Sequence, residues 1–211
     1  MIADDETQRG VPNDAIERRV EAAGAGLRGD EDTVRALLSD SDAKVRSAAY
    51  GALVRLGAAS ADDVARAIAD PDPVVRRSIC ELAARLPGAD FTPLLGDPDP
   101  AVVEAAAYAL GETGARQTTP LLAATAIQHP DPLCREAAVA ALGAIGDPAG
   151  KWAVLGALSD APAIRRRAVV ALSAFEGPDV EVALVEHLSD RDWQTRQAAA
   201  DVLGVSESEP R

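Results

Sequence analysis

The side chains most able to do chemistry in this sequence are arginines and aspartates that recur at a regular interval. One arginine position repeats about every 30 residues, and its members are Arg46, Arg76, Arg135, Arg165 and Arg196. An aspartate position precedes it, with the members Asp40, Asp70, Asp97, Asp160 and Asp190. A row of guanidinium groups could bind an anionic ligand, but a planar guanidinium can also bind a carboxylate together with turn carbonyls. The sequence therefore leaves two hypotheses, an anion-binding row or an internal Asp–Arg ladder.

Other reactive side chains are few. The two cysteines, Cys80 and Cys134, lie two repeats apart, at an expected separation of about 20 Å that is too long for a disulfide. No Ser-His-Asp order, phosphate-binding glycine loop or zinc-ligand spacing is visible in the sequence. We therefore predict no catalytic, cofactor-binding or metal-binding residue.

A repeated helical hairpin must position these side chains. Its first helix starts at an aspartate N-cap, followed in three repeats by a proline at the first helical position. The caps are Asp42, Asp72, Asp99, Asp131 and Asp192. Glycines are expected to end most of these helices, namely Gly57, Gly114, Gly146 and Gly177. A shorter second helix follows. Because each repeat buries its apolar face only against its neighbours, the sequence predicts an all-α, right-handed α-solenoid of about six hairpins.

The repeats set the predicted domain boundaries. They occupy residues 14–204, which we expect to form a single solenoid domain. Hydrophobic residues make up 47% of the chain and aromatic residues only 3%, so the core must consist mainly of small aliphatic side chains. The polar segments 1–13 and 205–211 lie outside the repeats and are expected to be disordered tails.

The charge of the chain restricts its partners. A formal net charge of -13 at pH 7 disfavours nucleic acid, because the phosphates would be repelled. No stretch approaches the roughly 18 to 20 apolar residues that span a bilayer, and the first residues lack the features of a signal peptide. We therefore expect a cytoplasmic protein that binds neither nucleic acid nor membranes. The many acidic residues fit a salt-rich cytoplasm or the codon bias of a GC-rich bacterium.

Two repeats carry a motif of a known family. DPAVVEAAAYALGETG at 99–114 and DPLCREAAVAALGAIG at 131–146 resemble HEAT repeats of the type named after phycobilisome lyases. The resemblance covers roughly residues 14–204 and implies the solenoid fold. In this family the Asp and Arg positions bridge adjacent repeats, so the resemblance favours an internal Asp–Arg ladder over anion binding. Val103 stands at the arginine position of one repeat, which manages without the charge.

Two enzyme classes of similar architecture are disfavoured by the residues present. The iron site of deoxyhypusine hydroxylase needs several His-Glu pairs on facing helices. This sequence has only His129 and His187, and the pair Glu186-His187 is in the reverse order. The HEAT-like DNA glycosylases need a basic groove with aromatic side chains, whereas this chain is acidic and poor in aromatics.

The sequence thus predicts a non-catalytic protein-binding scaffold or adaptor that uses the concave face formed by the second helices. The expected partner contacts are Arg35, Arg66, Arg116, Lys151, Trp152 and Glu186. The negative charge favours a protein partner with basic residues, and the chain by itself is expected to be monomeric. The family resemblance leaves one alternative, a bilin (phycocyanobilin) lyase-like subunit that acts with a second HEAT-type chain. A third possibility is a purely structural or regulatory module without one dedicated partner.

Overall fold

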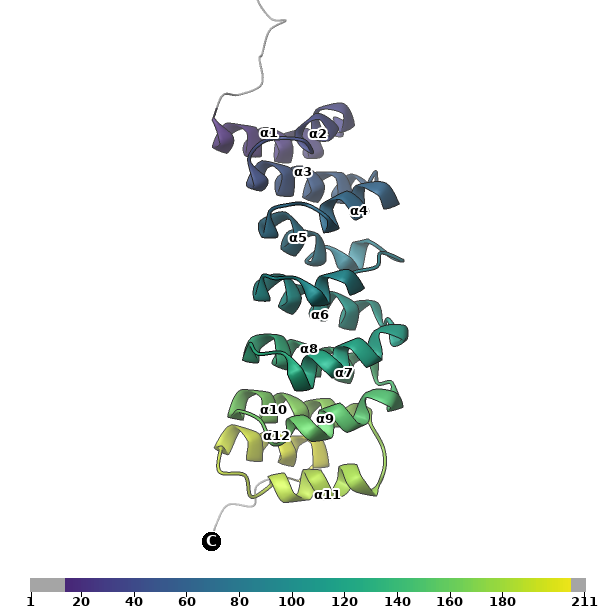
Figure 1. The fold of residues 1–211 in the computed structure, drawn as a ribbon, viewed down its shortest axis with the longest axis vertical. Helices are drawn as coiled ribbons and strands as arrows, with labels where there is room; N and C mark the ends of the chain where they lie inside the picture. The colour runs from purple at the N-terminus through teal and green to yellow at the C-terminus, as the bar shows by residue number, and fades with distance from the viewer. Residues whose placement is uncertain (1–13, 206–211) are drawn as a thin grey trace, which may run out of the picture. The chain divides into compact units, whose positions relative to one another are not determined.

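The computed structural model describes residues 14–205 (Figure 1). The chain divides into two compact units. Unit 1 ends at Ala89 and unit 2 begins at Asp90. Residues 1–13 and 206–211 lie outside the described part. The predicted tails, 1–13 and 205–211, therefore lie outside it as well, except for Val205. A single solenoid over residues 14–204 stays a prediction, and each unit is described by itself.

Unit 1 consists of two helical hairpins and the first helix of a third. Its elements are α1 (Ala15–Arg28), α2 (Glu31–Leu37), α3 (Ala43–Leu56), α4 (Ala61–Ile68), α5 (Pro73–Cys80) and the 3-10 turn η1 (Ala83–Arg85). The first helices α1, α3 and α5 stack in sequence, because α3 packs against both α1 and α5. The second helices α2 and α4 pack against the first helices and form the other layer of the unit.

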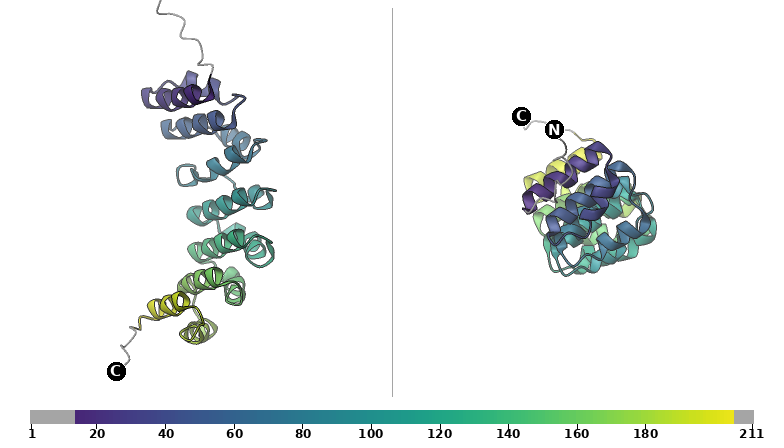
Figure 2. Two further views of the ribbon diagram at one scale, coloured as in Figure 1. Left: turned by 90° about the vertical axis from the view of Figure 1, so that its left-hand side faces the viewer. Right: turned by 90° about the horizontal axis from the view of Figure 1, so that it is seen from above.

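Unit 2 has the same alternation of first and second helices. Its elements are η2 (Thr92–Gly96), α6 (Pro100–Thr113), η3 (Arg116–Thr118), α7 (Thr119–Gln128), α8 (Pro132–Ile145), η4 (Pro148–Gly150), α9 (Lys151–Ala157), α10 (Pro162–Ala171), η5 (Leu172–Ala174), α11 (Pro178–His187) and α12 (Trp193–Leu203). The first helices α6, α8, α10 and α12 stack in one layer and the second helices α7, α9 and α11 lie on one side of them (Figure 1 and Figure 2). Residues 14–205 contain helices and turns without a strand, so the predicted all-α repeat fold is confirmed.

Local signals in the sequence explain where the first helices begin. All five predicted aspartates are N-caps, and each carboxylate accepts a hydrogen bond from a backbone N–H of the first turn. At α5, α6 and α8 a proline follows the cap at a position whose N–H would lack a partner in any case. Helix start is therefore decided by neighbouring residues and not by packing.

Helix ends follow the predicted glycines with one exception. Gly57, Gly114 and Gly146 adopt the left-handed conformation after α3, α6 and α8. The prediction for Gly177 is wrong, because α10 ends at Ala171 and Gly177 lies at the start of α11. A Cβ on Gly177 would lie 2.6 Å from Asp179 Oδ1 and 3.2 Å from Lys151 Nζ. The missing side chain makes room for that ion pair.

The first helix of the third hairpin is short. Leu82 and Leu86 continue the apolar spacing of α5, but α5 ends at Cys80 and is followed only by the turn η1. A proline disfavours the helical conformation of the residue before it. Leu86, which precedes Pro87, has φ -123° and ψ 61°, outside the helical region.

Small residues allow the first helices to approach each other closely. A Cβ on Gly111 of α6 would lie 2.9 Å from the Ala141 Cα of α8, and one on Gly143 of α8 would lie 2.7 Å from the Ala171 Cβ of α10. Such contacts leave no space for a larger side chain. The low aromatic content of the sequence therefore corresponds to tightly spaced helices. None of the helices within residues 14–205 is both long enough and apolar enough to cross a bilayer.

Candidate functional site

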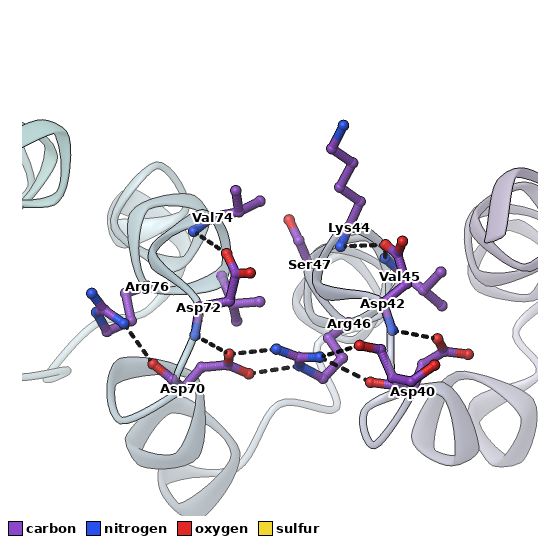
Figure 3. A network of polar contacts seen from close by, with 12 residues as sticks. Asp40, Asp42, Lys44, Val45, Arg46, Ser47, Asp70, Asp72, Val74 and Arg76 are labelled. Atoms are coloured by element: carbon purple, nitrogen blue, oxygen red, sulfur yellow. Dashed lines mark hydrogen bonds and ion pairs between the residues drawn. The ribbon is translucent and has the colours of Figure 1, made fainter. Parts of the chain in front are cut away.

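In unit 1 the repeated arginine and aspartate positions meet between consecutive hairpins. Arg46 at the start of α3 donates from Nε and Nη2 to the two carboxylate oxygens of Asp70, at 2.8 and 2.6 Å. Its Nη1 donates to the backbone carbonyl of Asp40 at 2.9 Å. Figure 3 shows the Arg46 guanidinium lying between Asp40 and Asp70. One side chain thus joins the turn before its own helix to the turn of the next hairpin.

Unit 2 repeats this geometry twice. Arg135 donates to both carboxylate oxygens of Asp160 at 2.7 and 3.0 Å, and Arg165 does so to Asp190 at 3.0 and 2.8 Å. Their Nη1 atoms donate to the carbonyls of His129 and Asp160, each at 2.9 Å. Each pair is bidentate and partly buried, and the arginine of one repeat always binds the aspartate of the following repeat.

The remaining ladder positions keep the carbonyl contact. Arg76 donates to the carbonyl of Asp70 at 2.8 Å, and Arg196 donates to that of Asp190 at 2.8 Å. The carboxylate of Asp97 accepts from the backbone N–H of Asp99 at 2.9 Å. The five predicted aspartates therefore lie in the turns before the first helices, and the five predicted arginines lie in the first turns of those helices.

Sequence reasoning missed the first arginine of the ladder. Arg18 of α1 donates from Nε and Nη2 to Asp40, at 2.6 and 3.0 Å. The signal for it was present, because Arg18 follows the N-cap Asp14 by four residues, as Arg46 follows Asp42. An alignment on the N-caps would have found it.

Val103 and His129 replace one pair of the ladder together. Val103 is fully buried at the arginine position, and His129 stands at the aspartate position of the next repeat. His129 Nδ1 accepts from the backbone N–H of Asp131 at 3.1 Å, as Asp70 accepts from Asp72 at 2.9 Å. The hydrogen bond to the backbone N–H before the helix is kept, while both the arginine and the aspartate of the ion pair are missing. Neither a buried arginine nor a buried aspartate is therefore left without its partner between these two repeats.

The arginines hold the pKa values of their aspartate partners below the usual range. The hydrogen bond from Arg165 lowers the pKa of Asp190 to about 2, against the opposing effect of burial. The hydrogen bond from Arg135 likewise lowers the pKa of Asp160. At Asp70 burial opposes the shift, but the bonds from Arg46 and from the Asp72 N–H outweigh it and lower the pKa. These carboxylates are charged and internally satisfied near neutral pH, which leaves the guanidinium groups little capacity for an external anion.

The two candidate contacts in unit 1 are already engaged within the protein. Arg35 of α2 binds Glu31 at 2.6 Å, Asp63 at 3.2 Å and the carbonyl of Ala58 at 2.9 Å. Arg66 of α4 forms an ion pair with the same Asp63. Asp63 is fully buried, and hydrogen bonds from Ser60 and the two arginines outweigh desolvation and lower its pKa to about 2.

The other four candidate contacts lie in unit 2. Lys151 at the start of α9 binds Asp179 at 2.8 Å and the carbonyl of Glu176 at 3.2 Å, and it thereby links the starts of α9 and α11. Trp152, Arg116 and Glu186 are exposed. Of the candidate residues, these three present side chains to solvent without an ion pair within residues 14–205.

The structure adds an apolar feature that sequence reasoning did not find. Leu121 of α7, Trp152 of α9 and Val182 of α11 are 48%, 58% and 58% exposed, and we call these three residues the second-helix strip. Each directly precedes two buried residues of its helix. They therefore occupy equivalent positions on consecutive second helices. The pairing of an exposed apolar residue with a following buried pair is the signal that could have identified them.

Potential metal ligands are dispersed and the cysteines are buried in the described part of the chain. Residues 14–205 contain no group of three or more His, Cys, Asp or Glu side chains that could hold a metal ion. Cys80 and Cys134 are buried and form no disulfide. Burial raises the pKa of the Cys134 thiol to about 11, so it is not a nucleophile near neutral pH.

Comparisons with known proteins agree with this architecture. A family model described as HEAT repeats matches residues 88–161. No curated protein matches the chain at a significant level. Together with the fold, the family match supports a HEAT-repeat protein.

Three solved structures illustrate the likeness. Human deoxyhypusine hydroxylase is 20% identical over 91% of this chain and 80% of its own, with a TM-score of 0.49. YibA of Escherichia coli is 17% identical over 93% of this chain and 76% of its own, with a TM-score of 0.63. A chain of the CpcE–CpcF complex of phycocyanin lyase from Nostoc sp. is 19% identical over 98% of this chain and 98% of its own, with a TM-score of 0.51. At these identities the likeness shows the fold alone.

Proposed function

We propose that this chain is a non-catalytic protein-binding scaffold, and that the second helices of unit 2 form its contact surface. The observation that carries the proposal is the second-helix strip of Leu121, Trp152 and Val182. A HEAT-type repeat array presents preformed side chains on rigid helices, so a partner can bind at a modest ordering cost. Exposed apolar residues at equivalent positions of consecutive helices offer one continuous row to such a partner.

The exposed tryptophan is the strongest single contact in this proposal. Tryptophan is enriched among the residues that dominate binding energy at protein interfaces. Trp152 lies on α9, which packs against α7, and Lys151 beside it links α9 to α11. The indole is therefore held by a supported helix and not by a mobile loop.

Acidic residues next to the strip indicate the chemistry of the partner. On α11 the exposed Val182 and Val185 lie one turn apart, and the exposed Glu181 and Glu186 lie on either side of them. With a formal net charge of -13, the chain attracts segments that carry lysine or arginine. We therefore propose a basic, partly apolar segment as the ligand of this surface.

The two tryptophans of the chain provide a matched test. Extract of the source organism is passed over the immobilised wild-type chain and over the Trp152→Ala and Trp193→Ala variants, and retained proteins are quantified by mass spectrometry. Trp193 on α12 is also exposed but lies outside the second helices. Trp152→Ala should lower retention of a specific partner at least tenfold, whereas Trp193→Ala should not. Equal retention by all three chains would refute the proposed surface.

A second candidate function is a bilin lyase-like subunit that acts with a second HEAT-type chain. It is favoured by one observation: the comparison with a chain of the CpcE–CpcF complex covers 98% of this chain and 98% of that chain. It ranks second because an identity of 19% shows the fold alone. Titration of phycocyanobilin into the chain tests this second function, since a shifted bilin absorbance band supports the lyase-like subunit and an unchanged spectrum counts against bilin binding by this chain.

A further inference from the structure

The first helix of unit 1 carries an apolar stripe that faces away from the core. Ile16, Val20 and Leu27 of α1 are 64%, 67% and 85% exposed. With the half-buried Ala23 between them they lie on one side of the helix. The opposite side buries Ala22 and Ala25 in the unit. We call Ile16, Val20, Ala23 and Leu27 the α1 stripe.

No other helix of unit 1 covers the α1 stripe, whose three large side chains remain exposed. A repeat buries its apolar face against its neighbours, so an exposed apolar stripe along a whole helix marks a contact surface. Within unit 1, α3 covers only one side of α1, as the close approach of Gly26 to Ala52 shows. The α1 stripe is therefore a surface suited to contact with another molecule.

The spacing of the stripe fits an antiparallel second copy of α1. Ile16, Val20, Ala23 and Leu27 are separated by four, three and four residues, the 4-3-4 spacing of a helix that packs on another helix. This order reads the same in both directions. An antiparallel second copy of α1 would set Ile16 against Leu27 and Val20 against Ala23, twice. Such self-complementarity is the requirement for a two-fold interface.

The charges beside the stripe fit the same arrangement. Glu17 and Arg28 are exposed on the same side of the α1 stripe, near opposite ends of the helix, and Arg28 also pairs with Glu21 of its own helix at 2.6 Å. A two-fold axis across an antiparallel helix pair keeps flanking residues on the same side. Glu17 of one copy would then lie next to Arg28 of the other, and each dimer would contain this pair twice. On the other flank Arg19 would face small residues of the second copy, so no like charges oppose each other there.

We propose that the α1 stripe is the interface between two antiparallel copies of this chain. A stable interface commonly buries about 800 Å² on each partner, and a pair of 14-residue helices offers less than that. The dimer is accordingly weak, with a dissociation constant on the order of 10 to 100 μM. This differs from the monomer expected from sequence, and it does not depend on the proposed function of unit 2.

Sedimentation equilibrium of the full chain from about 5 μM to 1 mM tests the proposal. The average mass should rise toward twice the monomer mass, and Leu27→Glu should weaken association at least tenfold. The matched control is Leu133→Glu on α8, which replaces another exposed apolar residue of a first helix and should leave association unchanged. A chain that stays monomeric up to 1 mM, or a dimer that tolerates Leu27→Glu, would overturn the proposal.

A charge exchange tests the antiparallel arrangement and guards against misfolded variants. Glu17→Arg alone places two arginines together at both ends of the interface and should weaken association at least threefold. Adding Arg28→Glu recreates two opposite-charge pairs and should restore association toward the wild-type level. Circular dichroism confirms that each variant is folded. A double variant that associates as weakly as the single one would refute the antiparallel copy.

Discussion

Val103 and His129 occupy the two positions that an arginine and an aspartate of consecutive repeats fill elsewhere in the protein. Val103 is fully buried, and His129 keeps only the hydrogen bond to the N–H of Asp131. The change at one position is therefore matched by the change at the other. This relationship indicates that the ion pairs between consecutive hairpins are built from two side chains that depend on each other.

Restoring the missing pair should show this dependence. Val103→Arg alone puts a charge into a buried site without a carboxylate and should lower the free energy of unfolding by about 3 kcal/mol. Val103→Arg combined with His129→Asp should recover most of that loss, because the two side chains can then pair as Arg135 and Asp160 do. Urea unfolding followed by circular dichroism measures both variants. If the double variant is as unstable as the single one, the pairwise account fails.

The burial of each pair should set its contribution to stability. Arg165 and Asp190 have side chains 6% and 9% exposed, whereas Arg135 and Asp160 are 19% and 23% exposed. Arg165→Ala should therefore lower the free energy of unfolding by about 3 kcal/mol, and Arg135→Ala by about 1 kcal/mol. The control Arg77→Ala removes an exposed pair with Glu81 and should cost less than about 0.5 kcal/mol. Equal effects of all three substitutions would contradict this ranking.

The lowered pKa of Asp190 should make the fold sensitive to acid. Its pKa is about 2 in the folded protein, below the ordinary value of 3.8. The stabilisation is therefore fully present above about pH 5 and is lost as the pH falls toward 2, with a contribution of about 2 kcal/mol from this group. Asp190→Asn removes this titration, so its stability should fall less steeply between pH 5 and pH 2. Parallel curves for the wild type and the variant would count against the assignment.

Close helix packing should reverse the usual effect of replacing glycine by alanine. Gly143→Ala should lower the free energy of unfolding by about 1 to 3 kcal/mol, because the new Cβ would lie 2.9 Å from the backbone Cα of Ala171. The control Gly51→Ala places its Cβ 3.4 Å from the flexible end of Arg55 and should instead stabilise the protein by up to about 1 kcal/mol. Thermal unfolding compares the two. A stabilising Gly143→Ala would show that α8 and α10 can separate at no cost.

The helix starts and the repeat could be predicted from sequence because both depend on neighbouring residues. The pair Asp72 and Pro73 specifies a cap and a first helical residue within two positions, and α5 starts there. The all-α repeat fold follows from the same local patterns, repeated along the chain. Gly177 shows the limit of local reasoning, because its role depends on Lys151, which lies on another hairpin.

The candidate site was harder to predict from the sequence, because its residues are defined by contacts between hairpins. The sequence predicts Arg35 to be an exposed helix residue, yet it binds Asp63 of the next hairpin. Arg116 has no such partner within residues 14–205. The sequence by itself determined where helices begin and which positions recur, since those signals act over a few residues. Only the tertiary structure decided which arginine meets which aspartate and which apolar residues stay exposed, because burial and ion pairing depend on distances between segments far apart in the chain.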